Sequence, residues 1–355
     1  MTATRPARPP GKVRAARLTD LAALGELSRL CQSDDPATRS LGLPVSGPPI
    51  GVFSLFRLPL GAFRPNDLMY VFEQEGRIAG LLRVEREASR DEWTVVELDG
   101  VGMGDAGDIR YRLIQQLLRE GAKRAAARFH VACADADGNI ELFMQAGFIR
   151  YGEERILFRP AGTELPAPWS DARAEEVGIR SAQQVDALAL QRLYEAVTPQ
   201  PVVRLEAIRL PDWERQGTHW RVPRSSLAPI LRFADVEGYV QATAGGGKDG
   251  TQLDAFLQVG VAKEYQPHYM KLIARPEADV SDLIEYGLGI IAAQTTRGGD
   301  HRLDHGVIAP VRTYEAPIDR RFEEAAFGYI ATVTLLMKET LVRVAEPALV
   351  PAGVR

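Results

Sequence analysis

A cluster of glycines near residue 100 has the spacing of a phosphate-binding turn. Four glycines between 100 and 107 follow the β-rich stretch 93–99 and precede an amphipathic helical pattern that includes 113–118. In the order strand, turn and helix, free backbone N–H groups at the helix start can bind an anion. The same order also describes a turn that only begins a helix, and both interpretations stay open.

Two acidic residues come shortly before this turn. Glu97 and Asp99 are two residues apart, so in a strand their side chains share one face, while Val96 and Leu98 occupy the other. Burial would raise the pKa of such a carboxylate toward values useful for proton transfer. A solvated strand face is the alternative.

Two other patterns resemble a metal site and a phosphate-binding loop, but each has a simpler explanation. His301 and His305 would share a helix face, as in some metal sites, yet a turn-like segment precedes them and a β-rich stretch follows. The run 243–250 is rich in glycine, but no helix follows it and no Ser or Thr comes directly after Lys248. We expect both segments to be exposed loops, and we expect no bound metal.

The composition is that of a globular protein with two domains. The chain has 355 residues, 45% of them apolar and 25% charged, and a formal charge of −4. This charge gives no long-range attraction to nucleic acid or to an anionic membrane, so neither partner is expected. Cys31 and Cys133 are too few for a disulfide framework, which suits a cytoplasmic protein.

An internal repeat points to duplication of a whole domain. Arg14 and Asp20 recur as Arg180 and Asp186, each 166 residues later, within matching strand and helix patterns. A second echo relates 69–84 to 230–243, both interpreted as hairpins with Gly76 or Gly238 in the turn. A third relates 145–148 to 324–327, each between a helical and a β-rich pattern.

These echoes give the expected domain boundaries. Residues 1–11 form a basic, proline-rich leader, 12–160 the first domain, 161–176 a proline-rich linker, 177–346 the second domain and 347–355 a tail. Each copy alternates helices with a mostly antiparallel set of strands. The predicted class is therefore a mixed α/β fold, an α+β mixed sheet, in tandem.

The order of elements in each copy resembles the GNAT superfamily of N-acetyltransferases. The features that carry the resemblance are the strand and helix at 13–31, the hairpin at 69–84, the strand at 93–101, the glycine turn and helix at 104–121, and the terminal 145–148 segment. The chain as a whole resembles tandem GNAT proteins. The resemblance implies acyl transfer from acetyl-CoA or another acyl-CoA to an amine of a small molecule or peptide, with Glu97 or Asp99 as the base.

The resemblance also implies where acyl-CoA would bind in the first copy. Its backbone contacts would come from Val101, Gly102, Met103, Gly104, Gly107, Asp108, Ile109 and Arg110. The family pattern Gln/Arg-x-x-Gly-x-Gly/Ala falls on Asp105, Asp108 and Arg110, so two carboxylates stand where a pyrophosphate docks. Each such like-charge contact would cost on the order of a kcal/mol.

The corresponding turn of the second copy, within 275–281, has no glycine, and Asp279 or Ser281 is better interpreted as a helix cap.

The family's general acid, a tyrosine near the end of each copy, is also missing. Phe143 and Phe322 occupy that place and cannot donate a proton. Tyr151 and Tyr314 are nearby in sequence, but they could replace the general acid only through an unusual geometry. The resemblance therefore leaves an alternative, a catalytically inactive tandem scaffold that binds a ligand or a protein partner. Oligomer formation is compatible with either interpretation.

The segment 199–224 corresponds to a variable acceptor-binding region of the family. It contains Trp213, His219 and Trp220, which are candidates for ligand contact or for the seam between the domains.

Overall fold

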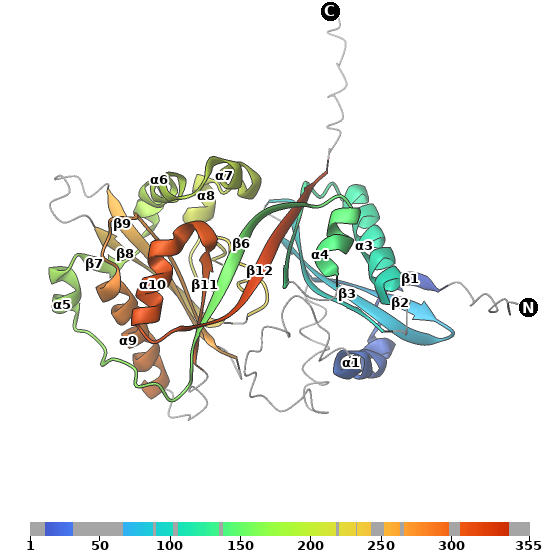
Figure 1. Ribbon diagram of the computed structural model, residues 1–355, viewed down its shortest axis with the longest axis horizontal. Coiled ribbons are helices and arrows are strands. Elements are labelled where there is room, and N and C mark those ends of the chain that lie inside the picture. Colours follow the sequence, from blue (N-terminus) through green and yellow to red (C-terminus); the bar gives the residue numbers. More distant parts are fainter. Residues whose placement is uncertain are drawn as a thin grey trace, which may run out of the picture.

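The computed structural model describes residues 11–30, 67–87, 90–101, 106–134, 138–217, 220–231, 233–242, 252–262, 266–297 and 306–340. Over these residues the chain forms one twelve-stranded sheet with helices on both faces (Figure 1). The first half comprises β1 Lys12–Ala15, a 3₁₀ turn Leu18–Asp20, α1 Leu21–Leu30, β2 Asp67–Gln74, β3 Arg77–Glu87, β4 Glu92–Gly100, α3 Ala106–Lys123, β5 Arg128–Ala134, α4 Asn139–Gln145 and β6 Ile149–Arg159.

The second half repeats this order with additional short helices. It comprises α5 Asp171–Glu176, β7 Ile179–Ser181, a 3₁₀ turn Gln184–Asp186, α6 Ala187–Val197, α7 Gln200–Glu206, α8 Leu210–Trp213, β8 Phe233–Ala242, β9 Leu253–Ala262, β10 His268–Ala274, α9 Ser281–Arg297, β11 Val307–Arg312, a 3₁₀ turn Thr313–Glu315, α10 Ala316–Glu324 and β12 Gly328–Glu339. Parallel and antiparallel pairs occur together in the sheet, which confirms the predicted mixed α/β class.

The two halves exchange their last strands. The order in the sheet is β1-β2-β3-β4-β5-β12-β6-β11-β10-β9-β8-β7. Strand β12, from the end of the second half, lies between β5 and β6 of the first, while β6 lies between β12 and β11 of the second. The ladder hydrogen bonds of each last strand therefore all go to strands of the other half. The boundaries expected from the sequence stay a prediction, but the hydrogen bonding crosses them.

Each half packs its own helices on both faces of the sheet. In the first half α3 and α4 cover one face, where Ile109, Leu113 and Leu117 of α3 are buried, and α1 covers the other. In the second half α9 and α10 cover one face and α6 to α8 the other. These apolar stripes at helical spacing are what fix each helix to the sheet.

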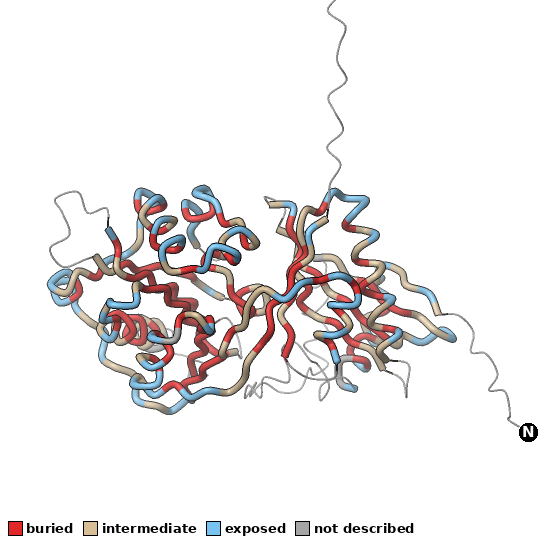
Figure 2. Tube along the Cα trace, turned by 45° about the horizontal axis from the view of Figure 1, so that its top comes forward, coloured by how far each residue is buried: buried red, intermediate tan, exposed pale blue. Residues whose placement is uncertain are grey.

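A separate cluster of apolar side chains joins the halves. It combines Ile156 and Phe158 of β6 with Val333 of β12, Ile308 of β11 and Leu227 of the segment before β8. Figure 2 shows buried stretches on the central strands of both halves, with intermediate and exposed residues between them. Within the described residues, no helix is both long and apolar enough to cross a membrane.

The first sequence echo is a repeated ion pair. The Asp20 carboxylate accepts hydrogen bonds from Arg14 at 2.7 and 2.9 Å, and Asp186 accepts the equivalent bonds from Arg180 at 2.7 and 2.6 Å. Each aspartate also accepts the backbone N–H three residues before it, which closes the 3₁₀ turn. The repeat at 166 residues thus preserves the turn that starts the first helix of each half.

For the second echo, the predicted turn position of the glycine is confirmed in the first half and wrong in the second half. Gly76 lies in the β2–β3 turn with φ +75°, as predicted. Gly238 lies in the middle of β8, opposite Gln258 of β9, and not in a turn. A Cβ atom on Gly238 would approach the Trp220 ring to 2.4 Å, so close packing is the reason for this glycine.

The third echo is a repeated helix end. Gly147 and Ala326 both have left-handed backbone, with φ +86° and +66°, between a short helix and an exchanged strand. The flanking pairs Phe143–Phe148 and Phe322–Phe327 pack edge to face with ring centres 5.0 and 4.9 Å apart. Both phenylalanines at the expected tyrosine position are therefore buried packing residues.

Strand exchange predicts that the halves cannot be separated into folded monomers. Residues 1–160 expressed alone would leave β6 without either neighbour and β5 with an unpaired edge, so we expect no cooperative thermal unfolding of a monomer. Co-expression with residues 161–355 should restore a one-to-one complex, measured by size-exclusion chromatography and circular dichroism. A monomeric first half that unfolds cooperatively would contradict the exchange.

Candidate active site at the splayed strands

Strands β4 and β5 separate in the middle of the first half. They pair in parallel only over Glu92–Val95 and Arg128–Val131, and residues 96–100 have no partner in β5. On its other edge β4 has a bulge at Val96, because Arg83 faces Glu97 while the next residue, Val84, faces Val95. A bulge increases local twist and bends the strand. The result is an opening in the sheet beyond Val95.

The start of α3 lies at the end of β4 and is accessible. A Cβ atom placed on Gly107 would meet no atom of the described residues within 4 Å, so these residues leave space beside the first turn of the helix. The Asp108 side chain is 57% exposed and pairs with Arg112 at 2.8 Å. The carboxylate expected to repel a pyrophosphate is thus turned outward and has a cationic neighbour.

The remaining predicted acyl-CoA contacts have different surroundings. Ile109 is buried in the core and Arg110 donates to Asn139 Oδ1 at 2.7 Å, which ties α3 to the start of α4. The N–H of Val101 donates to the carbonyl of Ala79. Gly102, Met103 and Gly104 lie outside the described residues, as does Asp105.

The two predicted catalytic carboxylates lie beside the opening. Leu98 packs into the core under α3, so strand alternation places Glu97 and Asp99 on the opposite face, the face that carries α1. The Glu97 carboxylate is 3.4 Å from Arg83 Nε and its side chain is 12% exposed. Asp99 is 2% exposed. Glu97 is therefore the more accessible of the two.

A small cavity of about 40 Å³ adjoins the point where the strands separate. Residues 94–96 of β4 and 130–132 of β5 line it from the first half, together with Tyr151 of β6. The segment 224–230 and Arg312 of β11 line it from the second half. Burial raises the pKa of the Tyr151 hydroxyl, so this group stays protonated. Both halves thus contribute to the space around the opening.

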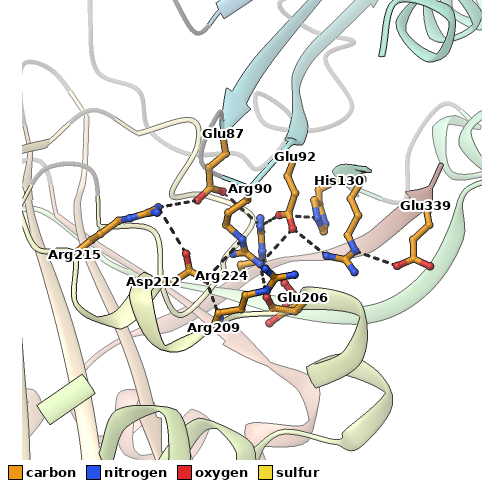
Figure 3. A network of polar contacts seen from close by, with 12 residues as sticks. Glu87, Arg90, Glu92, His130, Glu206, Arg209, Asp212, Arg215, Arg224 and Glu339 are labelled. Atoms are coloured by element: carbon orange, nitrogen blue, oxygen red, sulfur yellow. Dashed lines mark hydrogen bonds and ion pairs between the residues drawn. The ribbon is translucent and has the colours of Figure 1, made fainter. Parts of the chain in front are cut away.

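Buried ion pairs fix the second half against this opening (Figure 3). The Glu92 carboxylate, 1% exposed, is 3.3 Å from both Arg90 and Arg128 and also pairs with Arg224 of the second half. Arg90 in turn donates to the carbonyls of Glu206 and Ala207, at 2.5 and 2.9 Å, where α7 ends. These contacts hold the second half's segment over β4 and β5.

A second buried carboxylate orients Arg312. Glu206 accepts Arg312 Nη2 at 2.5 Å and the Tyr194 hydroxyl at 2.6 Å, and Arg312 Nε lies 3.0 Å from Glu154. All these groups are almost fully buried, so removal of one partner would leave an uncompensated charge.

His130 lies between this network and the cavity. Its Nε2 is 3.3 Å from Glu92 Oε2, and Nδ1 has no hydrogen-bond partner among the described residues. Burial lowers the pKa of His130 to about 4. The positive charges of Arg90 and Arg128 also lower this pKa, whereas the negative charge of Glu206 raises it. The ring is therefore neutral at physiological pH.

The second half has the same opening, but an ion pair fills it. β10 and β11 pair only at His268–Tyr269 with Val307–Ile308. Lys271, 1% exposed, donates to Glu315 at 2.9 Å and to the carbonyl of Pro310 in β11 at 3.2 Å. These contacts bridge the two separated strands. Asp279 accepts the N–H of Ser281 at 3.1 Å, as expected for a cap at the start of α9.

Two aromatic candidates for ligand contact belong to the core. Trp213 and Trp220 are 0% and 3% exposed and pack against Phe256, with ring centres 5.9 and 5.3 Å apart. The ligand-contact interpretation of both tryptophans is therefore wrong, because the sequence did not reveal that 220–231 folds back over the sheet. His219, His301, His305 and the run 243–250 lie outside the described residues. Among the described residues no group of three or more His, Cys, Asp or Glu is placed to hold a metal ion.

The sequence did not single out His130, Arg224 or Arg312. The sequence feature that could have identified such residues is a charged or polar residue inside an otherwise apolar strand. Arg312 at the end of 307–312 and Lys271 within 268–274 are examples. Such residues are rarely buried unless they are paired. This signal marks a buried network but does not indicate its partners.

The lowered pKa of His130 predicts an acid-sensitive stability. In the unfolded chain this histidine is protonated below about pH 6.5, whereas in the folded chain it is protonated only below about pH 4. The free energy of unfolding therefore falls as the pH drops from about 6.5 to about 4. We expect a loss on the order of 3 kcal/mol between pH 7 and pH 4 that the His130→Gln variant lacks. Urea unfolding across this range and NMR titration of the ring measure it. A ring that titrates near pH 6.5 would contradict the assignment.

Comparison with known proteins supports the architecture. No family model and no curated protein matches the sequence. A tandem GNAT protein from the clavulanic acid biosynthesis pathway, solved without AcCoA, is 12% identical, with a TM-score of 0.53 and coverage of 93% of this chain and 98% of that chain. A GCN5-related N-acetyltransferase from Sphaerobacter thermophilus is 15% identical, with a TM-score of 0.50 and coverage of 94% and 97%. The chain therefore has the tandem GNAT N-acetyltransferase fold over nearly all of its length, and the predicted duplication of that fold is confirmed.

Proposed function

We propose that the protein is an N-acyltransferase that uses acyl-CoA and acts on an amine in its first half. The observation that carries the proposal is the difference between the two openings. The one between β4 and β5 adjoins an accessible helix start, whereas the Lys271–Glu315 ion pair bridges the one between β10 and β11. A thioester arm would have room to enter the sheet only in the first half.

The start of α3 is the proposed pyrophosphate site. Backbone N–H groups of its first turn, from Gly107 to Arg110, carry the partial positive charge of the helix dipole. The turn 101–104 is proposed to complete the site, as the resemblance implies. Because Asp108 pairs with Arg112 at the surface, its repulsion of a phosphate is reduced.

Glu97 is the proposed general base. It lies directly after the Val96 bulge, on the face reached from the side of α1, and its side chain keeps some solvent access. The amine nitrogen would attack the thioester carbonyl, a C–N bond would form and the C–S bond would break. Glu97 would take the proton of the amine, directly or through water, and the departing thiolate would be protonated to CoA–SH. Asp99, more deeply buried, would act through its effect on Glu97.

A second candidate, a catalytically inactive tandem scaffold, is favoured by one observation. The two positions expected to carry the general acid hold buried phenylalanines, Phe143 and Phe322. In this alternative the openings between the strands belong to the fold but take no part in catalysis. The protein then binds a ligand or a protein partner without acyl transfer.

Calorimetry with acetyl-CoA separates the two candidates. We expect one binding site per chain, about tenfold weaker in Gly107→Glu, because the added carboxylate repels a phosphate at the start of α3. The open space beside Gly107 accommodates the new side chain. The matched variant Ser281→Glu, in the first turn of α9, should leave the affinity unchanged. No heat at near-millimolar acetyl-CoA would exclude the transferase and leave the scaffold.

Removal of the proposed base should affect turnover and not acyl-CoA binding. In Glu97→Gln the amide can still contact Arg83 but cannot accept the proton, so kcat should fall about a hundredfold or more. Acetyl-CoA affinity should stay at the wild-type value. Glu120→Gln, near the end of α3 where Glu120 pairs with Lys123, is the control. A kcat equal to the wild-type value would remove Glu97 from the mechanism.

A further inference from the structure

The polar lining residues of the small cavity between the halves are hydrogen-bond donors. No acidic residue is among its lining residues, whereas His130, Arg224, Ser226 and Arg312 are. Arg224 and Arg312 come from different elements of the second half and face strands of the first. A cavity with this lining favours a group that accepts hydrogen bonds.

Several of these donors have no hydrogen-bond partner among the described residues. They are Ser226 Oγ, Arg312 Nη1 and Arg224 Nε, all shielded from solvent. Ser226 is 7% exposed and Arg312 is 2% exposed. Buried donors that stay unsatisfied carry a large penalty and are rare in native proteins. Their convergence on one cavity indicates a bound group that the protein is built to receive.

Other nitrogens of the two guanidinium groups are engaged by carboxylates and by a backbone carbonyl. Arg312 Nη2 donates to Glu206 at 2.5 Å and to the carbonyl of Arg224 at 3.1 Å, while Arg224 Nη2 pairs with Glu92. The carboxylates therefore hold each guanidinium in place from the side away from the remaining donors. Burial lowers the pKa of Arg224 to about 9, and neighbouring Arg90 acts in the same direction.

The size of the cavity restricts what this group is. A volume of about 40 Å³ corresponds to roughly three water-sized positions. A carboxylate, planar and with two acceptor oxygens, matches this space and the bidentate geometry of guanidinium groups. A phosphate would need more room and more counter-charge.

We propose that the cavity binds the carboxylate of the acceptor, so that the acceptor is a small amino acid with a free amine and a free carboxylate. This inference rests on the proposed function. The cavity adjoins residues 94–96, where β4 leaves β5, and Glu97 follows directly. A carboxylate held by Arg224, Arg312 and Ser226 would place an amine a few bonds away at the opening, beside the proposed base.

The first test uses acetate and its neutral isostere acetamide as probes of the full-length protein. Acetate at tens of millimolar should raise the melting temperature above that in chloride of equal ionic strength, and acetamide should not. Ser226→Ala, which removes a hydroxyl with no partner, should weaken acetate binding three- to tenfold. Ser170→Ala, at the cap of α5 and away from the cavity, is the control and should bind acetate as the wild type does. Equal effects of acetate, acetamide and chloride, or an unchanged affinity in Ser226→Ala, would overturn the inference.

The second test compares acylation of glycine and glycinamide. The wild type should prefer glycine by at least tenfold in kcat/KM, and Ser226→Ala should reduce that preference while acetyl-CoA affinity stays the same. Acylation of both acceptors with equal kcat/KM would overturn the carboxylate site and leave the transferase. Acetate binding without any acetyl-CoA binding would remove the transferase and leave the anion site.

Discussion

The exchange of β6 and β12 is the constraint on which the arrangement of this protein depends. Because each last strand hydrogen-bonds only to strands of the other half, the two copies form one continuous sheet and cannot move as independent units. The apolar cluster around Ile156, Ile308 and Val333 fills the junction. The exchange also fixes where the second half's own segments lie, so that residues 224–230 cover the place where β4 and β5 separate.

Buried ion pairs are arranged differently at the two openings of the sheet. Around Glu92 and Glu206 four arginines come from both halves and hold a polar cavity at the junction. In the second half Lys271 and Glu315 instead close the equivalent opening. Buried pairs of this kind contribute little net stability, whereas removal of one partner is strongly destabilising. A duplicated fold has thereby acquired one accessible opening and one closed opening.

Parts of this architecture could be read from the sequence because they depend on local physics. The Arg14–Asp20 and Arg180–Asp186 turns are set within seven residues, so their repetition revealed the duplication. The turn at Gly76 was equally local. Gly238 was misassigned, because its need for a glycine comes from Trp220, which is close in space but belongs to another segment.

The strand exchange and the junction cavity could not be predicted from the sequence. β6 and β12 have compatible β-rich patterns, so nothing local distinguishes pairing within a half from pairing across halves. His130, Arg224 and Arg312 meet only as a result of that pairing. The common face of Glu97 and Asp99 could be predicted because period-two spacing in one strand is sufficient to place both side chains, whereas their catalytic role stays a prediction.

A crystal structure of the protein with acetyl-CoA tests the central claim most directly, namely that the two copies differ in access to the sheet. We predict electron density for the thioester arm between β4 and β5, with the Lys271–Glu315 ion pair still intact beside β10 and β11. Density for the arm between β10 and β11, with Lys271 displaced, would contradict it.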